Sequence, residues 1–300
     1  MKKIVVTLLL AFILMQVACA GEQPSAPPTD AAELESGNSA TAEPAASEAL
    51  PAEPQEITFQ ASDGQVLQGR YYPAGVDSAP LVVLMHWVNG DMNDWNEIAV
   101  WLQNRGLANP YPNPGEEGWW DPTWFPPMPE NVSYGVFIFS FRDCQPFPTS
   151  CAGWTPELWL LDAQAAMLKA TTLEGVDATR IVAIGSSIGG DGAIDGCTLL
   201  NEQIPGSCQG AASLGPGDYM EIPYATAVEK LGQEQPPKLA WCFVDPLNAY
   251  DYSVCQAISG EDFTMLEFPG GGHGQTLLRE EVTPSALEAV IDFLAAVFGP

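Results

Sequence analysis

Basic residues and histidines are scarce in this chain. Its 300 residues include ten Lys and Arg against 38 Asp and Glu, and only two His. A surface with this excess of negative charge repels phosphate backbones and anionic headgroups, so nucleic acid is not an expected partner and direct docking on a lipid surface is disfavoured. The two histidines and the absence of any Cys-x-x-Cys pair argue against a zinc site, and no metal or organic cofactor is predicted.

Long apolar runs are also missing, except at the start of the chain. Two lysines precede a stretch at residues 4–15 that is apolar except for Thr7; it is shorter than a typical membrane span and is typical of a secretory signal. The segment resembles a lipobox, although Gln16 stands where that motif usually has Leu. Residues 1–19 are therefore predicted to be a lipoprotein signal with Cys19 as the acylated residue. The alternative is ordinary cleavage before Gly21.

Residues 20–56 contain almost no large apolar side chains. They carry eight acidic residues and no basic one among Ala, Pro, Ser and Thr. Such a stretch cannot bury enough surface to offset its ordering entropy, so a disordered tether is predicted. We expect an extracytoplasmic protein, held at a bacterial cell envelope only through the lipid at Cys19, or otherwise secreted. Residues 57–300 are predicted to fold as one domain, and the sequence does not indicate its oligomeric state.

Six cysteines remain after Cys19, an even number that favours disulfides in an oxidising compartment. Sequence alone allows fifteen pairings. Closing short loops costs the least entropy, so neighbours along the chain are expected to pair. The predicted bridges are Cys144 with Cys151, Cys197 with Cys208, and Cys242 with Cys255.

Apolar runs of strand length alternate with segments of helical spacing. Strands are expected at 57–59, 66–72, 81–86, 136–141, 180–184, 211–214, 239–244 and 264–268, and helices at 93–105, 156–172, from 189 and from 283. This alternation predicts an α/β fold: a doubly wound, mostly parallel sheet of about eight strands with helices on both faces and no separate lid domain. A Trp- and Pro-rich insertion at 107–133 interrupts the pattern.

One glycine-flanked serine stands directly after a predicted strand. In Gly185-x-Ser187-x-Gly189 the glycines lie two residues before and after the serine, as a sharp strand-to-helix turn requires. Ser186 is out of phase because isoleucines flank it. Ser187 is therefore the candidate nucleophile. His273, in a glycine-rich loop after the last strand, is the candidate general base, and His86 is the only other histidine.

With these features residues 57–300 resemble the α/β-hydrolase superfamily, especially small single-domain esterases and dienelactone-hydrolase-like proteins. The resemblance implies a Ser-His-Asp triad whose acid follows the strand at 239–244. Asp245 occupies that position, and Asp251 is the alternative.

The resemblance also implies an oxyanion hole made of two backbone N–H groups. Ile188, after the nucleophile, supplies one, and Val88, after His86, supplies the other. The family usually has glycine after that histidine, whereas this chain has Trp87. His86 itself is interpreted as a structural residue that orients the loop.

Because ligands of open α/β sheets bind at the carboxyl ends of the strands, the loops there should line the cleft. Their apolar side chains, the predicted cleft walls, are Met92, Trp95, Phe147, Trp154 and Tyr219. The insertion joins a helix end to a strand start, at the opposite edge of the sheet. It is therefore expected to serve packing or partner contact, with substrate binding by its tryptophans as the alternative.

The predicted function is hydrolysis of a small-molecule or polymer carboxylic ester through a serine acyl-enzyme. The ester as substrate is implied by the resemblance alone. A serine peptidase or an acyltransferase on the same fold remains open. A rival of another class is a non-catalytic surface lipoprotein that binds a ligand in the same cleft.

Overall fold

The computed structural model describes residues 49–111, 120–144, 151–152 and 155–299. The chain divides into two compact units, Met1–Ala45 and Ala46–Pro300, and the described residues belong to the second. The predicted signal, Cys19 and most of the predicted tether lie outside the described residues. No helix within the described ranges is long and apolar enough to cross a membrane.

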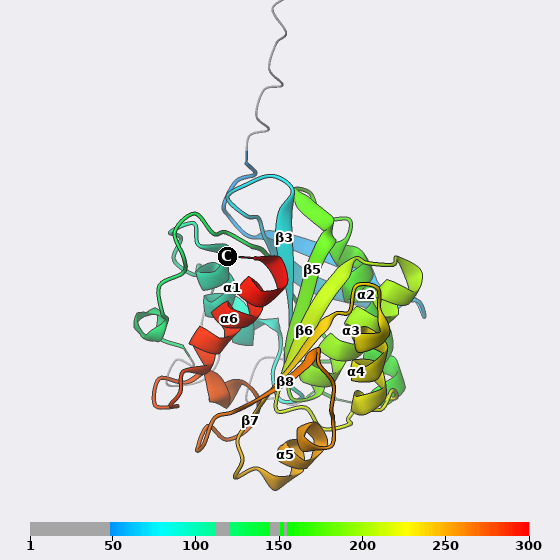
Figure 1. The fold of residues 1–300 in the computed structure, drawn as a ribbon. Coiled ribbons are helices and arrows are strands. Elements are labelled where there is room, and N and C mark those ends of the chain that lie inside the picture. Colours follow the sequence, from blue (N-terminus) through cyan, green and yellow to red (C-terminus); the bar gives the residue numbers. More distant parts are fainter. Residues whose placement is uncertain (1–48, 112–119, 145–150, 153–154, 300) are drawn as a thin grey trace, which may run out of the picture. The chain divides into compact units, whose positions relative to one another are not determined.

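An eight-stranded sheet organises the second unit (Figure 1). Its order is β1-β2-β4-β3-β5-β6-β7-β8; β1 is antiparallel to β2, β2 is antiparallel to β4, and the other neighbours are parallel. The strands are β1 Gln55–Gln60, β2 Val66–Tyr72, β3 Ala79–Met85, β4 Gly135–Ser140, β5 Val176–Ser186, β6 Cys208–Leu214, β7 Leu239–Val244 and β8 Phe263–Glu267. All eight predicted strands are confirmed.

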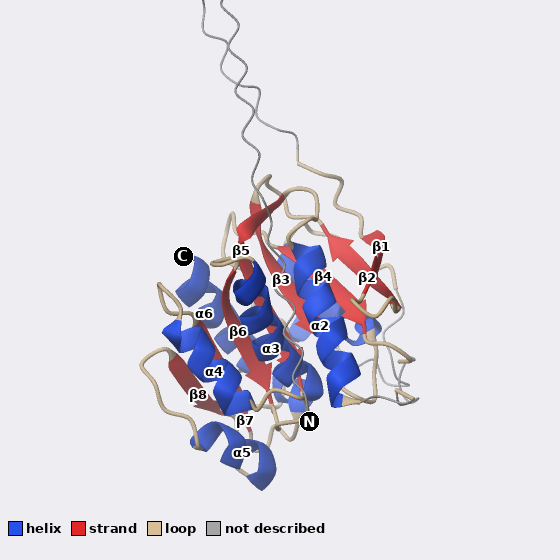
Figure 2. Cartoon of the chain, turned by 90° about the vertical axis from the view of Figure 1, so that its right-hand side faces the viewer, coloured by secondary structure: helices blue, strands red, loops and turns tan. Residues whose placement is uncertain are grey.

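Helices cover both faces of this sheet, as Figure 2 shows for the α2, α3 and α4 side. The opposite face is covered by α1 and α6 (Figure 1). The α-helices are α1 Asn96–Gln103, α2 Pro156–Ala170, α3 Ile188–Gln203, α4 Tyr224–Gln233, α5 Ala249–Gln256 and α6 Ala286–Phe298; short 3-10 helices are η1 Met92–Trp95, η2 Pro122–Trp124 and η3 Gly274–Leu278. The predicted doubly wound architecture is confirmed.

Two apolar layers hold the helices on the sheet. Every residue of β3 is buried, because helices press on both of its faces. One layer packs β-strand side chains against α2, α3 and α4, and the other packs them against α1 and α6. Local signals set the helix starts: the Thr155 hydroxyl accepts the Leu158 N–H at the start of α2, with Pro156 in the first turn.

The elements differ from the prediction mainly in one split helix, in the start of the first strand and in two additional helices. The expected helix 93–105 is split into η1 and α1. The first strand begins at Gln55, and the carbonyls of Leu50 and Ala52 accept hydrogen bonds from Arg105 and Gln103, so the end of the predicted tether belongs to the folded unit. Helices α4 and α5 were not predicted, and α5 matters most because it lies in the segment expected to be an acid-bearing loop.

The described part of the insertion packs along α1. Trp120 is fully buried, Trp124 is half-buried, and the Trp101 indole N–H donates to the Pro126 carbonyl. The indole N–H of Trp120 donates to the Asp94 carbonyl, which follows the carboxyl end of β3. The insertion therefore does not stay at the opposite edge of the sheet as expected, and its buried tryptophan serves packing.

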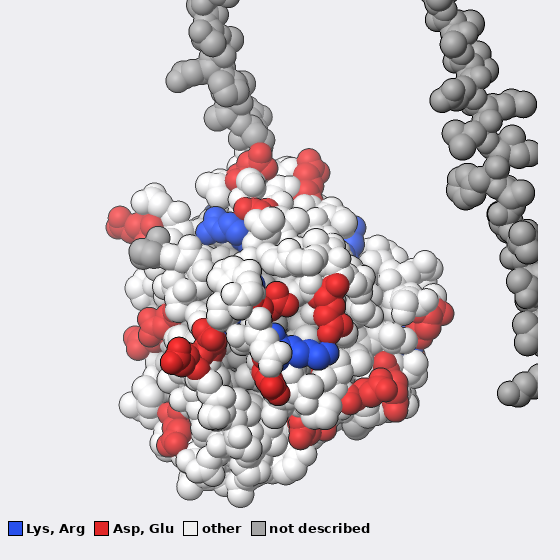
Figure 3. Space-filling model, turned by 45° about the vertical axis from the view of Figure 1, so that its right-hand side comes forward, with Lys and Arg blue, Asp and Glu red and all other residues white. Residues whose placement is uncertain are grey.

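Acidic side chains are spread over the face shown in Figure 3, with few basic ones among them. That face therefore shows no single concentrated patch of acidic side chains.

Candidate active site

Ser187 is the single residue that joins β5 to α3. Its backbone has φ 55° and ψ −125°, a positive-φ conformation that residues other than glycine rarely adopt. A Cβ at Gly185 would lie 1.8 Å from the Gly189 carbonyl oxygen, and one at Gly189 would lie 2.4 Å from the His86 carbonyl oxygen. Both flanking glycines are therefore required by close backbone approach, as the sequence predicted.

His273 follows β8 and meets the serine. Its Nε2 lies 2.7 Å from Ser187 Oγ, and its backbone N–H donates to the Thr276 hydroxyl. The side chain is 34 % exposed, so the ring is supported from one side and open on the other. The structure thus brings the predicted nucleophile and the predicted base into hydrogen-bond contact.

The carboxylate behind the histidine belongs to Asp251. Its Oδ2 lies 2.6 Å from His273 Nδ1, and its side chain is 2 % exposed. Asp251 stands in the first turn of α5, where Asn248 is the N-cap. The Asn248 side-chain amide donates to the same Asp251 oxygen at 2.6 Å. The helix start therefore aims the carboxylate at the histidine and supplies it with a second donor.

The structure does not bring the predicted acid, Asp245, into contact with His273; the alternative, Asp251, makes this contact. The Asp245 carboxylate instead accepts the backbone N–H groups of Leu247, Gly270 and Gly272. Burial opposes its charge, but these three donors together hold the pKa of Asp245 below its usual range. Asp245 therefore ties the segment after β7 to the glycine-rich segment before His273.

Val88 and Ile188 line one pocket with Ser187 and His273. Within the described part of the chain, neither residue donates its backbone N–H to another protein group. Two free donors beside a nucleophile have the chemistry of an oxyanion hole. The Val88 carbonyl accepts the N–H of Cys151, which braces this loop from outside.

His86 orients the start of that loop. Its Nε2 accepts the Phe141 N–H at 3.0 Å, so its Nδ1 carries the proton donated to the Trp87 carbonyl at 2.7 Å. Complete burial lowers the pKa of His86 to about 4, which keeps the ring neutral. Both ring nitrogens are used, in agreement with a structural role.

Trp87 is held by a buried carboxyl group. Its indole N–H donates to Asp94 Oδ2 at 2.9 Å, while the Asp94 backbone carbonyl accepts the side-chain N–H groups of Trp120 and Gln275. Burial, with the neighbouring Asp91 charge, raises the pKa of Asp94 to about 7. A Cβ at Gly90 would lie 1.7 Å from Asp94 Oδ2, so the hydrogen bond between Trp87 and Asp94 requires glycine at position 90.

The pocket in front of Ser187 has a volume of about 260 Å³. Tyr219 lines it as predicted, whereas Met92 and Trp95 are buried in the apolar layer against α1. Both point inward because the segment after β3 coils into η1 instead of running along the cleft. Phe147 and Trp154 lie outside the described residues. Residues that line this pocket but were not predicted as walls are Trp87 and Asn89, which bracket Val88 in the sequence.

The three predicted disulfides are confirmed: Cys144–Cys151, Cys197–Cys208 and Cys242–Cys255. Among the described residues, one group of three potential metal ligands converges, formed by His86 with Cys144 and Cys151. Its cysteines are joined in a disulfide and its histidine nitrogens are both hydrogen-bonded, so the group offers no free ligand set.

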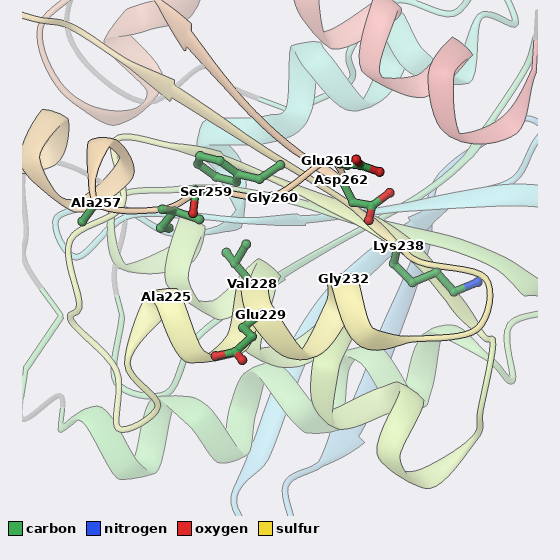
Figure 4. A pocket seen from close by; sticks show the side chains of 12 residues that line it. Ala225, Val228, Glu229, Gly232, Lys238, Ala257, Ser259, Gly260, Glu261 and Asp262 are labelled. Atoms are coloured by element: carbon green, nitrogen blue, oxygen red, sulfur yellow. The ribbon is translucent and has the colours of Figure 1, made fainter.

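A larger hollow of about 580 Å³ lies between α4 and the segment leading into β8 (Figure 4). Glu229 and Asp262 line it, and no serine–histidine pair does. The Lys238 side chain, also at its edge, points away from the centre in Figure 4 and donates to Gln209. Size alone therefore does not mark the reactive site, and the smaller pocket holds the only convergent nucleophile and base among the described residues.

No protein-family model matches the chain, and no curated protein matches it in sequence. Its structure is similar to many solved ones. The thermophilic carboxylesterase EstE1 from a metagenomic library aligns with a TM-score of 0.53 at 17% identity, covering 83% of this chain and 88% of that one. An esterase from Pyrobaculum calidifontis gives 0.57 at 16% identity, covering 83% and 86%.

The α/β hydrolase GrgF from Penicillium sp. sh18 gives a TM-score of 0.57 at 15% identity and covers 84% of this chain and 100% of that one. At such identities the likeness concerns the fold. Together with the strand order, the elbow at Ser187 and the helices on both faces, it identifies the described unit as an α/β-hydrolase fold.

Proposed function

We propose that this chain is an exported serine hydrolase that cleaves carboxylic esters. The observation that carries the proposal is the chain of contacts from Asp251 through His273 to Ser187. It opens on a pocket lined by Val88 and Ile188, whose N–H groups have no acceptor among the described residues. Neighbours of the same fold are named carboxylesterase and esterase, which supports the substrate class.

In the proposed reaction His273 Nε2 takes the proton of the Ser187 hydroxyl as Oγ attacks the ester carbonyl carbon. The carbonyl oxygen becomes an oxyanion that the N–H groups of Val88 and Ile188 stabilise. Collapse of this intermediate breaks the bond to the alcohol oxygen, which receives the proton from His273. Water then attacks the acyl-enzyme by the same route and releases the acid. Asp251 fixes the histidine tautomer and stabilises its cation.

Hydrolysis of p-nitrophenyl esters of increasing acyl length by the full chain tests this function. We expect turnover that Ser187→Ala abolishes, and labelling by a fluorophosphonate that the same variant loses. Ser186→Ala is the matched control: its hydroxyl accepts the Gln275 N–H, so the variant loses stability but keeps the labelled serine.

A folded protein that is inert to the probe and to every ester would contradict the hydrolase and favour the ligand-binding lipoprotein. Turnover of peptides alone would favour a serine peptidase. Transfer to an alcohol in preference to water would favour an acyltransferase.

Export and lipid attachment at Cys19 are part of the same proposal. The apolar run at residues 4–15 and three disulfides in the folded unit support an oxidising destination. Mass spectrometry of the mature N-terminus tests it. A diacylglyceryl-modified Cys19 is expected, and a chain that begins at Gly21 would contradict the anchor.

A further inference from the structure

One tyrosine lines the reactive pocket and a second tyrosine lies beside it. Tyr219 lines the pocket itself, and its ring centre lies 5.9 Å from that of Tyr250. Tyr250 is 52% exposed, so its ring is accessible to a ligand that extends out of the pocket. The two rings form a continuous aromatic wall from the pocket outward.

This wall is held by buried polar groups. The carboxylate of Asp191, on the first turn of α3, accepts the backbone N–H groups of Gly217 and Tyr219. The Tyr250 hydroxyl donates to the Gly217 carbonyl. A Cβ at Gly217 would lie 2.4 Å from the Tyr219 ring, so the ring rests directly on glycine backbone.

Burying the Asp191 carboxylate is costly, and desolvation raises its pKa to about 7. Asp191 accepts a hydrogen bond from the loop that carries Tyr219. Asp191 itself lies on α3, the helix that begins beside Ser187. The wall is therefore fixed relative to the nucleophile, because both are anchored to the start of α3. Fixed aromatic rings bind a partner with little loss of conformational entropy.

The wall stands on the histidine side of the pocket. A Cβ at Gly215, where the Tyr219 loop begins, would lie 2.8 Å from Asp251 Oδ2 and 3.1 Å from His273 Nδ1. Tyr250 immediately precedes Asp251 on α5. In ester cleavage the histidine protonates the departing alcohol oxygen, so the alcohol half must lie beside it.

We propose that Tyr219 and Tyr250 form a subsite for the alcohol half of the ester, which selects aromatic alcohols over small alkyl ones. This inference rests on the proposed ester hydrolysis. The two tyrosines bind the leaving alcohol in this proposal. Trp87, Val88 and Asn89, in the segment after β3, also line the pocket. Ring-to-ring contact of this kind corresponds to a preference of about 3- to 10-fold in kcat/KM.

Two isomeric esters test the assignment in the full chain. Phenethyl acetate carries its ring on the alcohol half, and ethyl phenylacetate carries it on the acyl half, while the acidities of the two alcohols are similar. We expect the ratio of kcat/KM for phenethyl acetate over ethyl phenylacetate to fall about 3- to 10-fold in Tyr250→Ala. Tyr250→Phe keeps the ring and loses only the bond to Gly217, so its ratio should fall less.

Tyr252→Ala is the matched control, because Tyr252 lies on the same helix and donates its hydroxyl to Glu267. It should leave the ratio unchanged. Phenethyl alcohol should inhibit competitively, with an inhibition constant that rises in Tyr250→Ala. Active enzyme whose ratio is the same in Tyr250→Ala and wild type would overturn the subsite and leave ester hydrolysis standing. Absence of all ester turnover, with Ser187 unreactive, would overturn both.

Discussion

Two segments flank the nucleophile, and they are held in place by different interactions. The segment after β7 carries Asp251 and is closed by the Cys242–Cys255 bridge and by Asp245, whose carboxylate accepts three backbone N–H groups. The segment after β3 carries Val88 and depends on Asp94, whose Oδ2 has one side-chain donor and whose Oδ1 has no partner among the described residues.

The difference appears in the protonation of the two carboxyl groups. Saturation by N–H donors outweighs burial and keeps the pKa of Asp245 low, whereas burial dominates at Asp94 and raises its pKa to about 7. The segment that carries Asp251 is therefore held by a carboxylate, Asp245, that stays charged at neutral pH. The segment that carries Val88 is held by Asp94, which gains or loses a proton near neutral pH. Burial alone therefore does not decide the charge of a positioning carboxylate.

The largest predicted effect separates the two aspartates of the β7 segment. Asp251→Asn should lower kcat about 10³- to 10⁴-fold, because an amide favours the wrong histidine tautomer. Asp245→Asn keeps one acceptor atom but loses the charge, so we expect a loss of stability of about 1–3 kcal/mol with a much smaller loss of kcat. Ester kinetics and thermal unfolding of both variants measure this. A larger loss of kcat in Asp245→Asn would reverse the assignment.

A smaller effect is expected on the oxyanion side. Trp87→Phe keeps an aromatic ring at this position but removes the N–H that holds Asp94 Oδ2, so kcat should fall about tenfold, less than removal of an oxyanion donor itself. Trp101→Phe makes the same chemical change at an indole bound to the Pro126 carbonyl and should leave kcat unchanged. Equal kinetics in both variants would show that Asp94 does not position the loop.

A further predicted effect concerns the pH dependence of stability, not the rate. The pKa of Asp94 is about 7 in the folded state and about 4 in the unfolded chain, so the folded state holds the extra proton and loses stability as pH rises from 4 to 7. The loss is at most about 1.4 kcal/mol per pH unit. Asp94→Asn keeps an acceptor for Trp87 and removes the titration.

The Tm of Asp94→Asn relative to wild type should therefore increase between pH 5 and pH 8. His86, whose pKa of about 4 gives the opposite trend between pH 4 and 6.5, is present in both proteins and cancels. Asp292→Asn, at an exposed position on α6, should show no such increase. A Tm difference that stays constant over this range would contradict the raised pKa of Asp94.

Local patterns made much of this structure predictable. The elbow at Ser187 needs glycines at fixed distances, and the three disulfides close short loops, so both could be inferred from spacing. The strands were recognisable because runs buried on both faces are continuously apolar. These features depend on residues close together in the chain.

The weak apolar pattern of α5 led the sequence interpretation to favour Asp245 over Asp251 as the partner of His273. Asn248 at the N-cap and Asp251 three residues later are a start signal for α5, and the sequence interpretation treated this segment as a loop. Trp95 was misplaced for a related reason: the turn at η1 rotates it into the apolar layer, which depends on packing against α1 and the insertion. The orientations of Asp251 and Trp95 cannot be inferred from the number of residues that separate them from the end of a strand.

The residues assigned to the reaction come from five neighbouring strand ends. Along β3, β5, β6, β7 and β8 the following segments supply, in order, Val88, Ser187, Tyr219, Asp251 and His273. Each segment contributes one component, and the strands beneath are a common rigid frame. Redesign of the segment between β6 and α4 is therefore a route to new alcohol selectivity in an engineered variant, provided that Gly217 and the contacts to Asp191 are kept.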